Sequence, residues 1–392
     1  MSNATIQRAM IIGGGIGGLC AAIALRQIGI EVTVLEKAPV LGNVGAGLVL
    51  WPNAIRVLRQ LGAAEAIINA GSAIDHGQIR TAAGKILSRS EPGELRQLLG
   101  EPTVAIHRAD LHAILLSLLP AGVVRLGVSG FTVAPSQTGV TVNSAGGQTD
   151  RVDLLIGADG IHSQVRQQIF PAVKLRYGGY SAWRGVVNAP DTVAEGITTE
   201  MWGRGSRFGV VPIDARRVYW YATLNQPAGR DYSPVSQKAL LQQHFAGWMR
   251  PVESLLEATP AEAILHHDIY DIAPLLCWSQ GRITLLGDAV HPTTPNMGQG
   301  ACMAIESAWV LARSIAAAPD VPTALAAYEQ ERQPRTAWIT NQSWQIGRLG
   351  QLENGLGCRL RDAVLALTPA SVVKTRLAKV TAYPDAPLFN QP

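Results

Sequence analysis

The sequence has few charged residues, no basic tract and no long apolar run. Only 16% of its 392 residues are charged, and 33 basic against 29 acidic residues give a formal net charge of +4. Because the basic residues are scattered along the chain, we do not expect a nucleic-acid partner. No uninterrupted apolar stretch is long enough to span a bilayer. The first apolar run, at residues 9–12, leads into a glycine turn and not a cleavage site, so we expect a cytoplasmic protein.

Cysteine is also scarce, and its pattern argues against disulfides and metal sites. The cysteines show no paired spacing and lie in apolar stretches, which favours buried free thiols in a reducing compartment. They are Cys20, Cys277, Cys302 and Cys358. The adjacent His266, His267 and Asp268 resemble metal ligands, but neighbouring residues on a strand point to opposite faces. We therefore expect no metal site.

Glycine, in contrast, is abundant, and one cluster has the spacing of a dinucleotide-binding turn. The run GGGIGG at residues 13–18 follows a short apolar strand and precedes a helix rich in Ala and Leu. Gly13 allows the tight turn, Gly15 lets the backbone approach a pyrophosphate, and Gly18 permits close packing of helix on strand. Glu36 ends the next strand, where a carboxylate accepts hydrogen bonds from ribose hydroxyls. The alternative is a glycine-rich turn without a ligand.

Two further glycine turns carry an acidic residue directly after a buried strand. They are GADG at residues 157–160, with Asp159, and GD at residues 287–288, with Asp288. Each turn alone is at least as often structural, but both together with the N-terminal fingerprint predict an extended FAD. The loop after Asp288 leads into a helix, and the backbone N–H groups at the start of this helix suit the N1–C2=O edge of a flavin. The alternative is an ordinary N-cap loop. This loop contains Pro295, Gly298, Gln299, Gly300 and Ala301.

The periodicity of the chain changes along its length, which indicates a discontinuous architecture. Residues 9–36 have the pattern of a βαβ unit, and residues 45–61 that of a strand followed by a helix. Residues 77–88 predict a hairpin that turns at Ala83 and Gly84, and Asp110 is placed as the N-cap of a helix. Residues 175–224 alternate aromatic and small residues, as in an antiparallel sheet. Helices return after Val235, and residues 283–286 add a strand to the first sheet.

These patterns predict an α/β fold with an FAD-binding Rossmann-like domain of the glutathione-reductase type, an inserted antiparallel-sheet substrate domain and a helical C-terminus. We assign residues 1–72, 106–171 and 276–352 to a discontinuous FAD-binding domain. Residues 73–105 and 172–275 form the substrate domain, and residues 353–392 form a C-terminal helical segment. Residues 360–380 carry basic side chains among Leu, Val and Ala. They form either a helix that covers the FAD domain, the simpler interpretation, or an amphipathic helix in weak contact with a membrane surface.

At this point the motifs resemble those of a known family, the class A FAD-dependent monooxygenases, which includes salicylate, 6-hydroxynicotinate and urate hydroxylases. The most specific stretches are GADGIHSQVR at residues 157–166 and GDAVHP at residues 287–292. The resemblance extends over residues 11–380. It is strongest to the branch that contains 2-heptyl-3-hydroxy-4(1H)-quinolone synthase, through WGRGSRFG at residues 202–209, YWYATL at residues 219–224 and residues 342–351.

The resemblance implies a set of cofactor contacts. The resemblance also implies NAD(P)H as a transient co-substrate, and the lack of a second dinucleotide fingerprint agrees with this. One departure is Leu41 and Gly42, where many relatives carry an arginine. The implied contacts to FAD, besides Gly13 and Gly18, are Gly15, Glu36, Lys37, Val49, Arg108, Val128 through its backbone, Asp159, Asp288, Pro295, Gly298, Gln299, Gly300 and Ala301.

The resemblance also implies the reaction. NAD(P)H reduces the flavin, O2 adds to give a C4a-hydroperoxide, and one oxygen is transferred to an aromatic or heteroaromatic ring, which an alkylquinolone-like substrate would supply. Arg207 and Tyr219 match substrate residues of the family, and with Pro295 they are the candidate catalytic residues. The alternative interpretation is that Arg207 is a solvated charge at the end of a strand and that Tyr219 is a packed aromatic of the sheet. Val49, Trp183 and Tyr221 are candidate pocket residues, although aromatics in a sheet often belong to a core. An apolar Val49 favours an apolar ring.

Other functions remain as alternatives. A decarboxylating salicylate-type hydroxylase or an epoxidase would use the same fold, and a flavin-binding sensor or electron carrier would transfer no oxygen. His291 has the residue type of a general base, but its place in GDAVHP favours a structural hydrogen bond. The partners expected are a small aromatic molecule, O2 and NAD(P)H, and the pattern specifies no oligomeric state.

Overall fold

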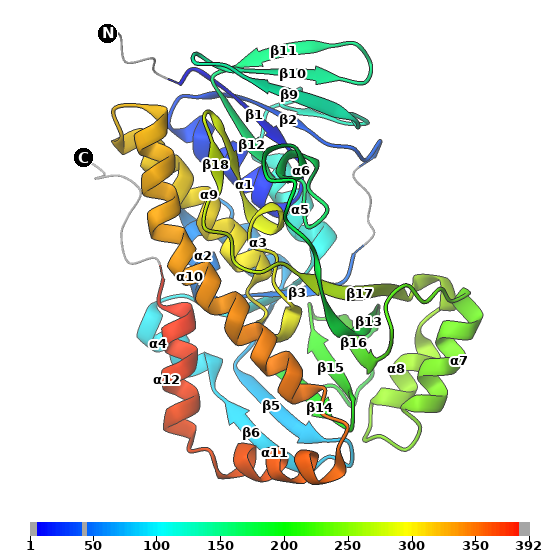
Figure 1. Ribbon diagram of the computed structural model, residues 1–392. Helices are drawn as coiled ribbons and strands as arrows, with labels where there is room; N and C mark the ends of the chain where they lie inside the picture. Colours follow the sequence, from blue (N-terminus) through cyan, green and yellow to red (C-terminus); the bar gives the residue numbers. More distant parts are fainter. Residues whose placement is uncertain (1–5, 41–44, 384–392) are drawn as a thin grey trace.

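The computed structural model describes residues 6–40 and 45–383, and the predicted α/β architecture with two large sheets is confirmed (Figure 1). Leu41 and Gly42 lie outside the described residues. The first sheet has six strands in the order β18-β19-β12-β1-β2-β8, and all neighbours are parallel except β18 and β19. The strands are β1 (Arg8–Ile12), β2 (Glu31–Leu35), β8 (Val124–Arg125), β12 (Leu154–Gly157), β18 (Ser279–Gln280) and β19 (Ile283–Leu285).

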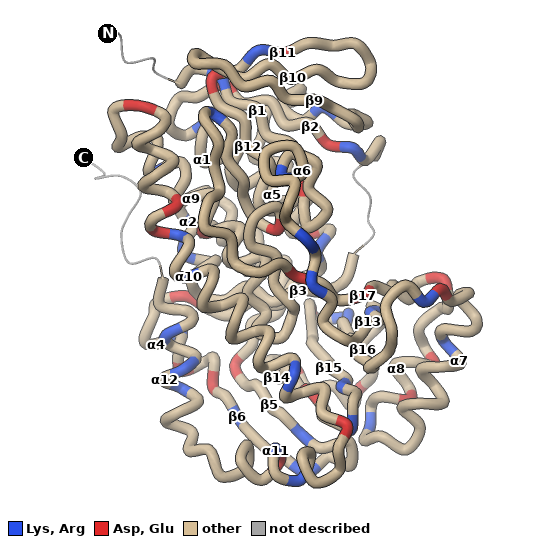
Figure 2. Tube along the Cα trace, in the orientation of Figure 1, with Lys and Arg blue, Asp and Glu red and all other residues tan. Residues whose placement is uncertain are grey.

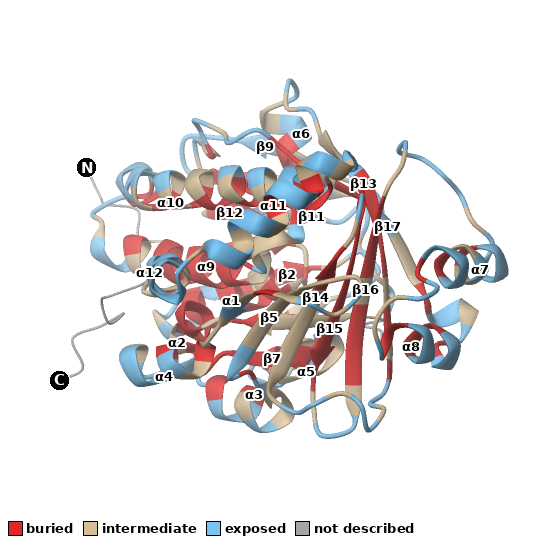
Figure 3. Ribbon diagram, turned by 90° about the horizontal axis from the view of Figure 1, so that it is seen from below, coloured by how far each residue is buried: buried red, intermediate tan, exposed pale blue. Residues whose placement is uncertain are grey.

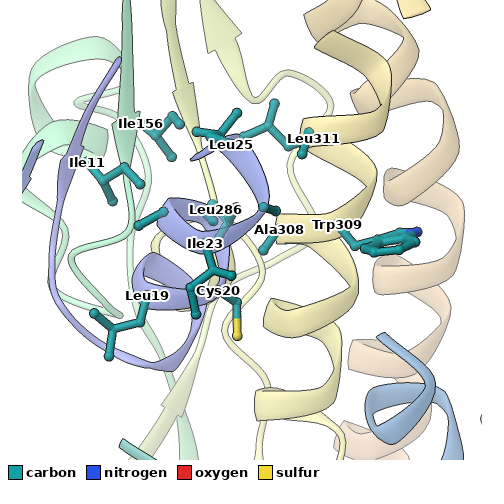
Figure 4. Packing of buried hydrophobic residues seen from close by; sticks show 14 of the residues in the cluster. Ile11, Leu19, Cys20, Ile23, Leu25, Ile156, Leu286, Ala308, Trp309 and Leu311 are labelled. Atoms are coloured by element: carbon teal, nitrogen blue, oxygen red, sulfur yellow. The ribbon is translucent and has the colours of Figure 1, made fainter. Parts of the chain in front are cut away.

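The first sheet is buried between helices, as the apolar sequences of β1 and β12 require. Helix α1 (Ile16–Gln27) lies against it and packs on α9 (Gly300–Ala317), with Leu19, Ile23 and Leu311 in the shared core (Figure 4). A Cβ atom at Gly17 would lie 2.8 Å from Cδ2 of Leu286, so glycine permits this close approach. The N-termini of α1 and α9 therefore lie close to the sheet edge where the glycine turns occur.

The second sheet has seven strands in the order β17-β13-β16-β15-β14-β5-β6, and only β14 and β5 are parallel neighbours. The predicted hairpin forms β5 and β6, and Gly84 at its turn has φ +95°. The strands are β5 (His76–Thr81), β6 (Ile86–Ser90), β13 (Arg176–Asn188), β14 (Ile197–Trp202), β15 (Ser206–Pro212), β16 (Arg217–Asn225) and β17 (Leu265–Asp271).

The two faces of the second sheet have different surroundings. One face carries Trp183, Phe208 and Trp220 and forms a core with α7 (Pro234–His244) and α8 (Val252–Ala258). The opposite face carries Tyr219 and Tyr221 and packs against β3 (Gly47–Leu50). Figure 3 shows the central strands β13, β15 and β16 buried between these layers. The face with the two tyrosines is therefore the one that meets the first half of the chain.

Smaller elements flank the two large sheets. A three-stranded meander, β9 (Phe131–Pro135), β10 (Val140–Ser144) and β11 (Thr149–Val152), was not expected from the sequence. A second small sheet joins β3, β7 (Val104–His107) and β4 (Ser72–Ala73). Helix α10 (Val321–Gly350) runs alongside both large sheets (Figure 1). The other helices are α2 (Pro52–Gln60), α3 (Ala64–Ala70), α4 (Pro92–Leu99), α5 (Arg108–Ser117), α6 (Gln164–Ile169), α11 (Gly355–Leu367) and α12 (Ala370–Thr381), with short 3-10 turns η1 (Ala261–Ala263), η2 (Gly287–Ala289) and η3 (Pro295–Met297).

Three local expectations were wrong. Helix α5 begins at Arg108 with His107 as its N-cap, so Asp110 lies in the first turn, where it pairs with Arg217. Cys277 is exposed, because it lies in the loop before β18, although the other three cysteines are buried free thiols as predicted. Residues 360–380 form two helices and not one, because Pro369 ends the first and begins the second.

The described residues contain neither a membrane-spanning helix nor a cluster of metal ligands. No helix in the described ranges is both long and apolar enough to cross a bilayer. Within residues 6–40 and 45–383, no group of three or more His, Cys, Asp or Glu side chains has the arrangement of a metal site.

Candidate active site

The glycine fingerprint forms a tight turn between β1 and α1. Gly13 has φ +107°, and its N–H donates to the carbonyl of Leu35 at 2.7 Å. A Cβ atom at Gly13 would lie 2.3 Å from the carbonyl oxygen of Ala158, and one at Gly18 would lie 2.0 Å from that of Gly13. A Cβ atom at Gly15 would meet no atom within 4 Å. Gly13 and Gly18 are thus required by packing, whereas Gly15 faces open space at the helix start, as a pyrophosphate site needs.

Glu36 is held beside this turn. Its carboxylate accepts the N–H of Gly14 at 2.7 Å and that of Ala38 at 2.9 Å. The N–H of Val128 donates to the Glu36 carbonyl at 3.0 Å, so the backbone of Val128 lies next to Glu36. His112 contacts the Gly14 carbonyl through Nε2 at 2.6 Å. A carboxylate has about four lone-pair positions, so Glu36 can still accept bonds from a ribose.

Asp159 has a structural task in the second glycine turn. Its carboxylate accepts the hydroxyl of Ser163 at 2.5 Å and the N–H of Gln164 at 2.7 Å, so it caps α6. Its Cα would lie 2.9 Å from a Cβ atom at Gly13, which places the acidic turn against the fingerprint. The structure brings Asp159 to the cofactor edge, but its oxygens already accept hydrogen bonds from α6.

Arg166, which was not among the residues expected at the site, connects the second and third turns. Its guanidinium is buried; Nη1 donates to the carbonyl of Ala289 at 2.8 Å and Nη2 to that of Ile161 at 2.5 Å. Ala289 follows Asp288 directly. Only the place of Arg166 within the GADGIHSQVR motif could have indicated this role.

Asp288 and Arg108 lie close to each other at the edge of the first sheet. Asp288 follows β19 in the short turn η2, and Arg108 is the first residue of α5. Both side chains are exposed. The protein around Asp288 nevertheless raises the pKa of its carboxyl, and the positive charge of Arg108 opposes that shift. We interpret the exposure and the raised pKa together: the Asp288 carboxylate is open to solvent on one side and surrounded by protein atoms on the others.

The strand order explains why these groups meet. Strands β19, β12, β1 and β2 are consecutive neighbours, and all four are parallel. Their carboxyl ends therefore lie at one edge of the sheet, where Asp288, Asp159, Gly13 and Glu36 follow in turn. Exposed Lys37 comes directly after Glu36.

The loop before α9 provides backbone donors at the same edge. Pro295 begins the turn η3, and Gly298 has φ +62°, which favours glycine. Helix α9 then begins at Gly300 with Gln299 as its N-cap, and Ala301 follows in its first turn. The amide of Asn53 donates to Oε1 of Gln299 at 3.0 Å, which fixes the loop against α2. An 18-residue helix with free N–H groups at its start favours a group that gains negative charge.

Arg207 lies beside this loop on β15, but its guanidinium is fully engaged by protein. It is 3% exposed. Its Nε donates to Oε1 of Gln351 at 2.8 Å, and its Nη2 donates to Oδ1 of Asn296 at 2.7 Å. Nη1 donates to Glu200 at 3.1 Å. Burial lowers the pKa of Arg207, but the carboxylate of Glu200 together with the phenols of Tyr180 and Tyr221 outweighs burial, so the pKa is raised. The solvated strand-end alternative is therefore wrong, and Arg207 links the loop after Pro295 to the second sheet and the end of α10.

The structure brings Val49, Tyr219 and Tyr221 together on one apolar face, at the same side as Arg207. The rings of Tyr219 and Tyr221 are 5.9 Å apart. A Cβ atom at Gly209 would lie 2.1 Å from Cε1 of Tyr221, so glycine lets this ring lie over β15. The other members of the face are Ala46, Ile74, Ala105, Val186, Val211 and Ile213.

Trp183 is not part of this group. It is fully buried on the opposite face of the second sheet, and its ring stacks on that of His266 with centroids 4.7 Å apart. The register explains the separation, because Trp183 pairs with Ala222 and its neighbour Arg184 pairs with Tyr221. Trp183 is thus a core aromatic, which corrects its assignment as a pocket residue.

Two polar residues that were not expected from the sequence, Arg184 and Glu200, lie next to the tyrosines. Burial raises the pKa of Tyr219, and a hydrogen bond and the charge of Arg184 lower it in part. Burial raises the pKa of Tyr221 well above its ordinary value, and the Glu200 carboxylate raises it further. Both phenols therefore stay protonated at neutral pH.

His291 has the structural role that its motif suggested. The side chain is buried, and Nε2 lies 2.9 Å from the hydroxyl oxygen of Ser307. Burial, with the positive charge of Arg332, lowers the pKa of His291 to about 3. The ring is therefore neutral at physiological pH and buried in the helical core, which does not suit a general base for a substrate.

Comparison with known proteins agrees with this geometry. Residues 7–343 match the family model described as an FAD binding domain. The chain is 41% identical over 369 residues to an aurachin C monooxygenase/isomerase of Stigmatella aurantiaca, covering 94% of this chain and 96% of the relative. It is 34% identical over 365 residues to a 2-heptyl-3-hydroxy-4(1H)-quinolone synthase of Pseudomonas aeruginosa, covering 92% and 94%. The expected resemblance is confirmed, and similarity to the aurachin enzyme is the higher of the two.

A solved structure extends the agreement to the whole fold. The crystal structure of Klebsiella pneumoniae HpxO complexed with FAD and uric acid superposes with a TM-score of 0.90, at 29% identity and covering 96% of each chain. The glycine turns, the parallel strand edge and the donors at α9 fit the FAD that this family binds. The chain therefore belongs to the FAD-binding-domain family and is an FAD-dependent monooxygenase.

Proposed function

We propose that the enzyme hydroxylates a heteroaromatic ring that carries an alkyl chain, with an alkylquinolone as the substrate class. The observation that supports this most directly is the apolar face around Val49, Tyr219 and Tyr221, which lies beside the loop at Pro295. A planar ring with an aliphatic chain would bury apolar area there, at roughly 25 cal/mol per Å². The quinolone synthase among the relatives forms, by its name, a quinolone that carries a heptyl chain.

The groups at the sheet edge support a proposal for where the cofactor binds. FAD, when bound and reduced by NAD(P)H, supplies the activation of O2 that no amino-acid side chain provides. We propose that Glu36 binds the adenosine ribose and that Gly15 admits the pyrophosphate. Asp288 and Arg108 would contact the middle of the cofactor, and the N–H groups at Gly300 and Ala301 would face the flavin ring. Lys37 and Val128 border the adenosine end, and Val49 and Pro295 border the ring.

The polar groups on the tyrosine face would orient the substrate. Because both phenols stay protonated, each can donate a hydrogen bond to a ring oxygen. We propose that Tyr221 relays the proton of the ring: it takes that proton while its own hydroxyl proton passes to the carboxylate of Glu200, and the reverse transfer returns it. Arg184, which carries a positive charge and can only donate, would hold the hydroxyl oxygen of Tyr219 in place. Arg207 would act through Asn296, by holding the loop at Pro295 in position. The apolar residues would exclude water from the reacting ring.

We further propose that the division of the chain follows the two sheets. Residues 1–72, 106–171 and 276–352 would carry the cofactor, and residues 73–105 and 172–275 the substrate. A reducing cytoplasm suits an enzyme that consumes NAD(P)H and has unpaired thiols at Cys20, Cys277, Cys302 and Cys358.

A second candidate substrate is a small anionic heteroaromatic ring. The guanidinium of Arg184, half-buried on the tyrosine face, would bind a ring oxygen or carboxylate. Decarboxylating hydroxylation of a salicylate-like acid would use the same contact. The relative solved with uric acid gives this candidate its support.

One assay separates the candidates. NAD(P)H oxidation by the FAD-loaded enzyme is followed with alkylquinolones, salicylates, uric acid and an isolated alkene, and the products are identified by mass spectrometry. We expect faster oxidation with a quinolone and a product heavier by one oxygen atom. Turnover of salicylates or uric acid alone would favour the second candidate, and an epoxide from the alkene would indicate an epoxidase. Flavin reduction without any oxygenated product would contradict ring hydroxylation.

A further inference from the structure

Helix α11 exposes an unbroken apolar stripe. Leu356, Leu360, Val364 and Leu367 are 78%, 67%, 57% and 81% exposed. Their spacing of four, four and three residues places them on one side of the helix. The buried residues Cys358 and Arg361 lie on the other side. Single exposed leucines are ordinary, but a row of this length along a helix indicates a surface that meets something apolar.

Basic residues accompany the stripe. Residues 354–383 contain five basic residues and one acidic residue, Asp362. Arg359 is exposed next to the stripe on α11, and Arg376 is exposed on α12. Lys374 pairs with Glu94 at 2.6 Å, and Lys379 lies 4.9 Å from the ring of Trp338. Figure 2 shows basic positions on α11, which lies across the lower end of the molecule, and on α12, which runs up its side.

We propose that the exposed side of α11, together with the basic residues of α12, docks on the surface of an anionic lipid bilayer. An apolar stripe of this width enters the boundary between headgroups and acyl chains, while arginine and lysine side chains contact anionic headgroups. The helix has 13 residues and lies flat on β6, so it contacts one leaflet and does not span it. This surface is independent of which ring the enzyme hydroxylates.

A second copy of the chain is the rival occupant, and the charges argue against it. A two-fold dimer places the same patch on both subunits. The stripe would then bring the exposed Arg359 close to its own copy, whereas Lys374 on α12 is already paired with Glu94. Asp362 already accepts a hydrogen bond from Arg361 at 2.9 Å. Like charges at an interface oppose association, whereas an anionic membrane neutralises them.

The position of α11 gives the docking surface a short connection to the candidate site. Asn354 caps α11, three residues after Gln351, whose side chain accepts the hydrogen bond from Arg207. The guanidinium of Arg361 donates to the carbonyl of Gly203, in the turn between β14 and β15. An enzyme docked through α11 would thus hold the Arg207 end of its second sheet near the bilayer, where a substrate with an alkyl chain partitions.

The test measures binding of the FAD-loaded protein to vesicles by flotation. Neutral phosphatidylcholine vesicles are compared with vesicles that contain phosphatidylglycerol. The variant Leu356→Ser/Leu360→Ser/Leu367→Ser removes most of the stripe, and Arg359→Gln/Arg376→Gln removes two charges. The matched control is Leu276→Ser, because Leu276 is 89% exposed in a loop away from α11. Flavin content and NAD(P)H oxidation with a water-soluble substrate verify that each variant is folded.

We expect the wild type and Leu276→Ser to float with anionic vesicles. The stripe variant should bind at least about tenfold more weakly than the wild type. The charge variant should lose the preference for anionic lipid. Wild type that stays unbound on both vesicle types would overturn the proposal. A concentration-dependent dimer, seen by sedimentation and lost in the stripe variant, would assign the surface to a second copy instead. Neither result bears on ring hydroxylation, which the water-soluble substrate reports separately.

Discussion

Arg166 and Ala289 are 123 positions apart in the chain, yet Nη1 of Arg166 donates to the carbonyl oxygen of Ala289 at 2.8 Å. The bond joins the turn that carries Asp159 to the turn that carries Asp288. Because the guanidinium is buried, water cannot replace it. The bond therefore adds a buried side-chain link between the two acidic turns to the backbone pairing of β12 with β19.

Arg166→Ala should weaken FAD binding and destabilise the protein. Loss of the guanidinium leaves the buried carbonyl of Ala289 unsatisfied, at about 1–3 kcal/mol, and removes the donor of the half-buried carbonyl of Ile161. Arg166→Lys retains the charge but cannot reach both carbonyls at once, so it should fall between alanine and the wild type. Flavin dissociation constants and urea unfolding of the three proteins measure the effect. Wild-type FAD affinity in Arg166→Ala would show that the bond does not position Asp288.

Asp288→Ala should yield protein without flavin. The carboxylate lies at the edge where the parallel strands end, next to Arg108, and its removal leaves that cation unbalanced. The ratio of flavin to protein absorbance after purification gives the result. Asp191→Ala, at an exposed loop position away from this edge, is the control and should purify yellow. A fully yellow Asp288→Ala protein would contradict the proposed contact.

Gly209→Ala should raise KM for the aromatic substrate and leave FAD content unchanged. The new Cβ atom would lie 2.1 Å from Tyr221 Cε1, so the ring must leave its place on β15. Tyr221→Phe keeps the packing and removes only the hydroxyl, and should lower kcat more than it changes KM. Steady-state kinetics separate the two effects. Equal losses of flavin and activity in Gly209→Ala would instead indicate a general packing defect.

Arg207→Ala should lower both stability and kcat. Its removal leaves Glu200, Gln351 and Asn296 without their buried donor, at about 3 kcal/mol for a broken buried pair. Thermal unfolding and kinetics measure the change, and a double-mutant cycle with Asn296→Ala should show coupling of about 1 kcal/mol. If Arg207→Ala raised only KM and unfolded like the wild type, Arg207 would contact the substrate directly.

Stability should fall on acidification between about pH 6.5 and pH 3, in part through His291. The folded protein keeps this ring neutral until the pH reaches about 3. An unfolded chain takes up the proton near pH 6.5, so the unfolded state binds more protons within this window. The group contributes a slope of about 1.4 kcal/mol per pH unit there. His291→Gln should show a flatter decline in urea unfolding across this range, and an unchanged slope would contradict the assignment.

The residues at the sheet edge that we propose to bind FAD could largely be predicted from the sequence. The spacing of Gly13, Gly15 and Gly18 and the position of Glu36 depend on backbone geometry within a single βαβ unit, which a short stretch of chain specifies. The apolar strands before Asp159 and Asp288 indicate a parallel sheet, and parallel strands end at one edge. The family match confirms the fold and the cofactor that these local patterns predicted.

The arrangement of the proposed substrate residues could not be predicted from the sequence, because it depends on tertiary contacts. Alternation along β13 shows that Trp183 and Arg184 point in opposite directions, but not which side meets β3 and the loop at Pro295. The partners of Arg207 lie 89 and 144 positions away at Asn296 and Gln351, so no local pattern predicts its burial.

The C-terminal segment shows the same division. Its amphipathic composition was evident from residues 360–380, whereas the break at Pro369 and the exposure of the α11 stripe depend on how two helices pack against β6. The sequence by itself determined the cofactor, the fold class and the glycine turns, because each arises from local backbone geometry. Only the tertiary structure decided which side chains share the substrate face and which remain exposed, because burial depends on contacts between residues distant in the chain.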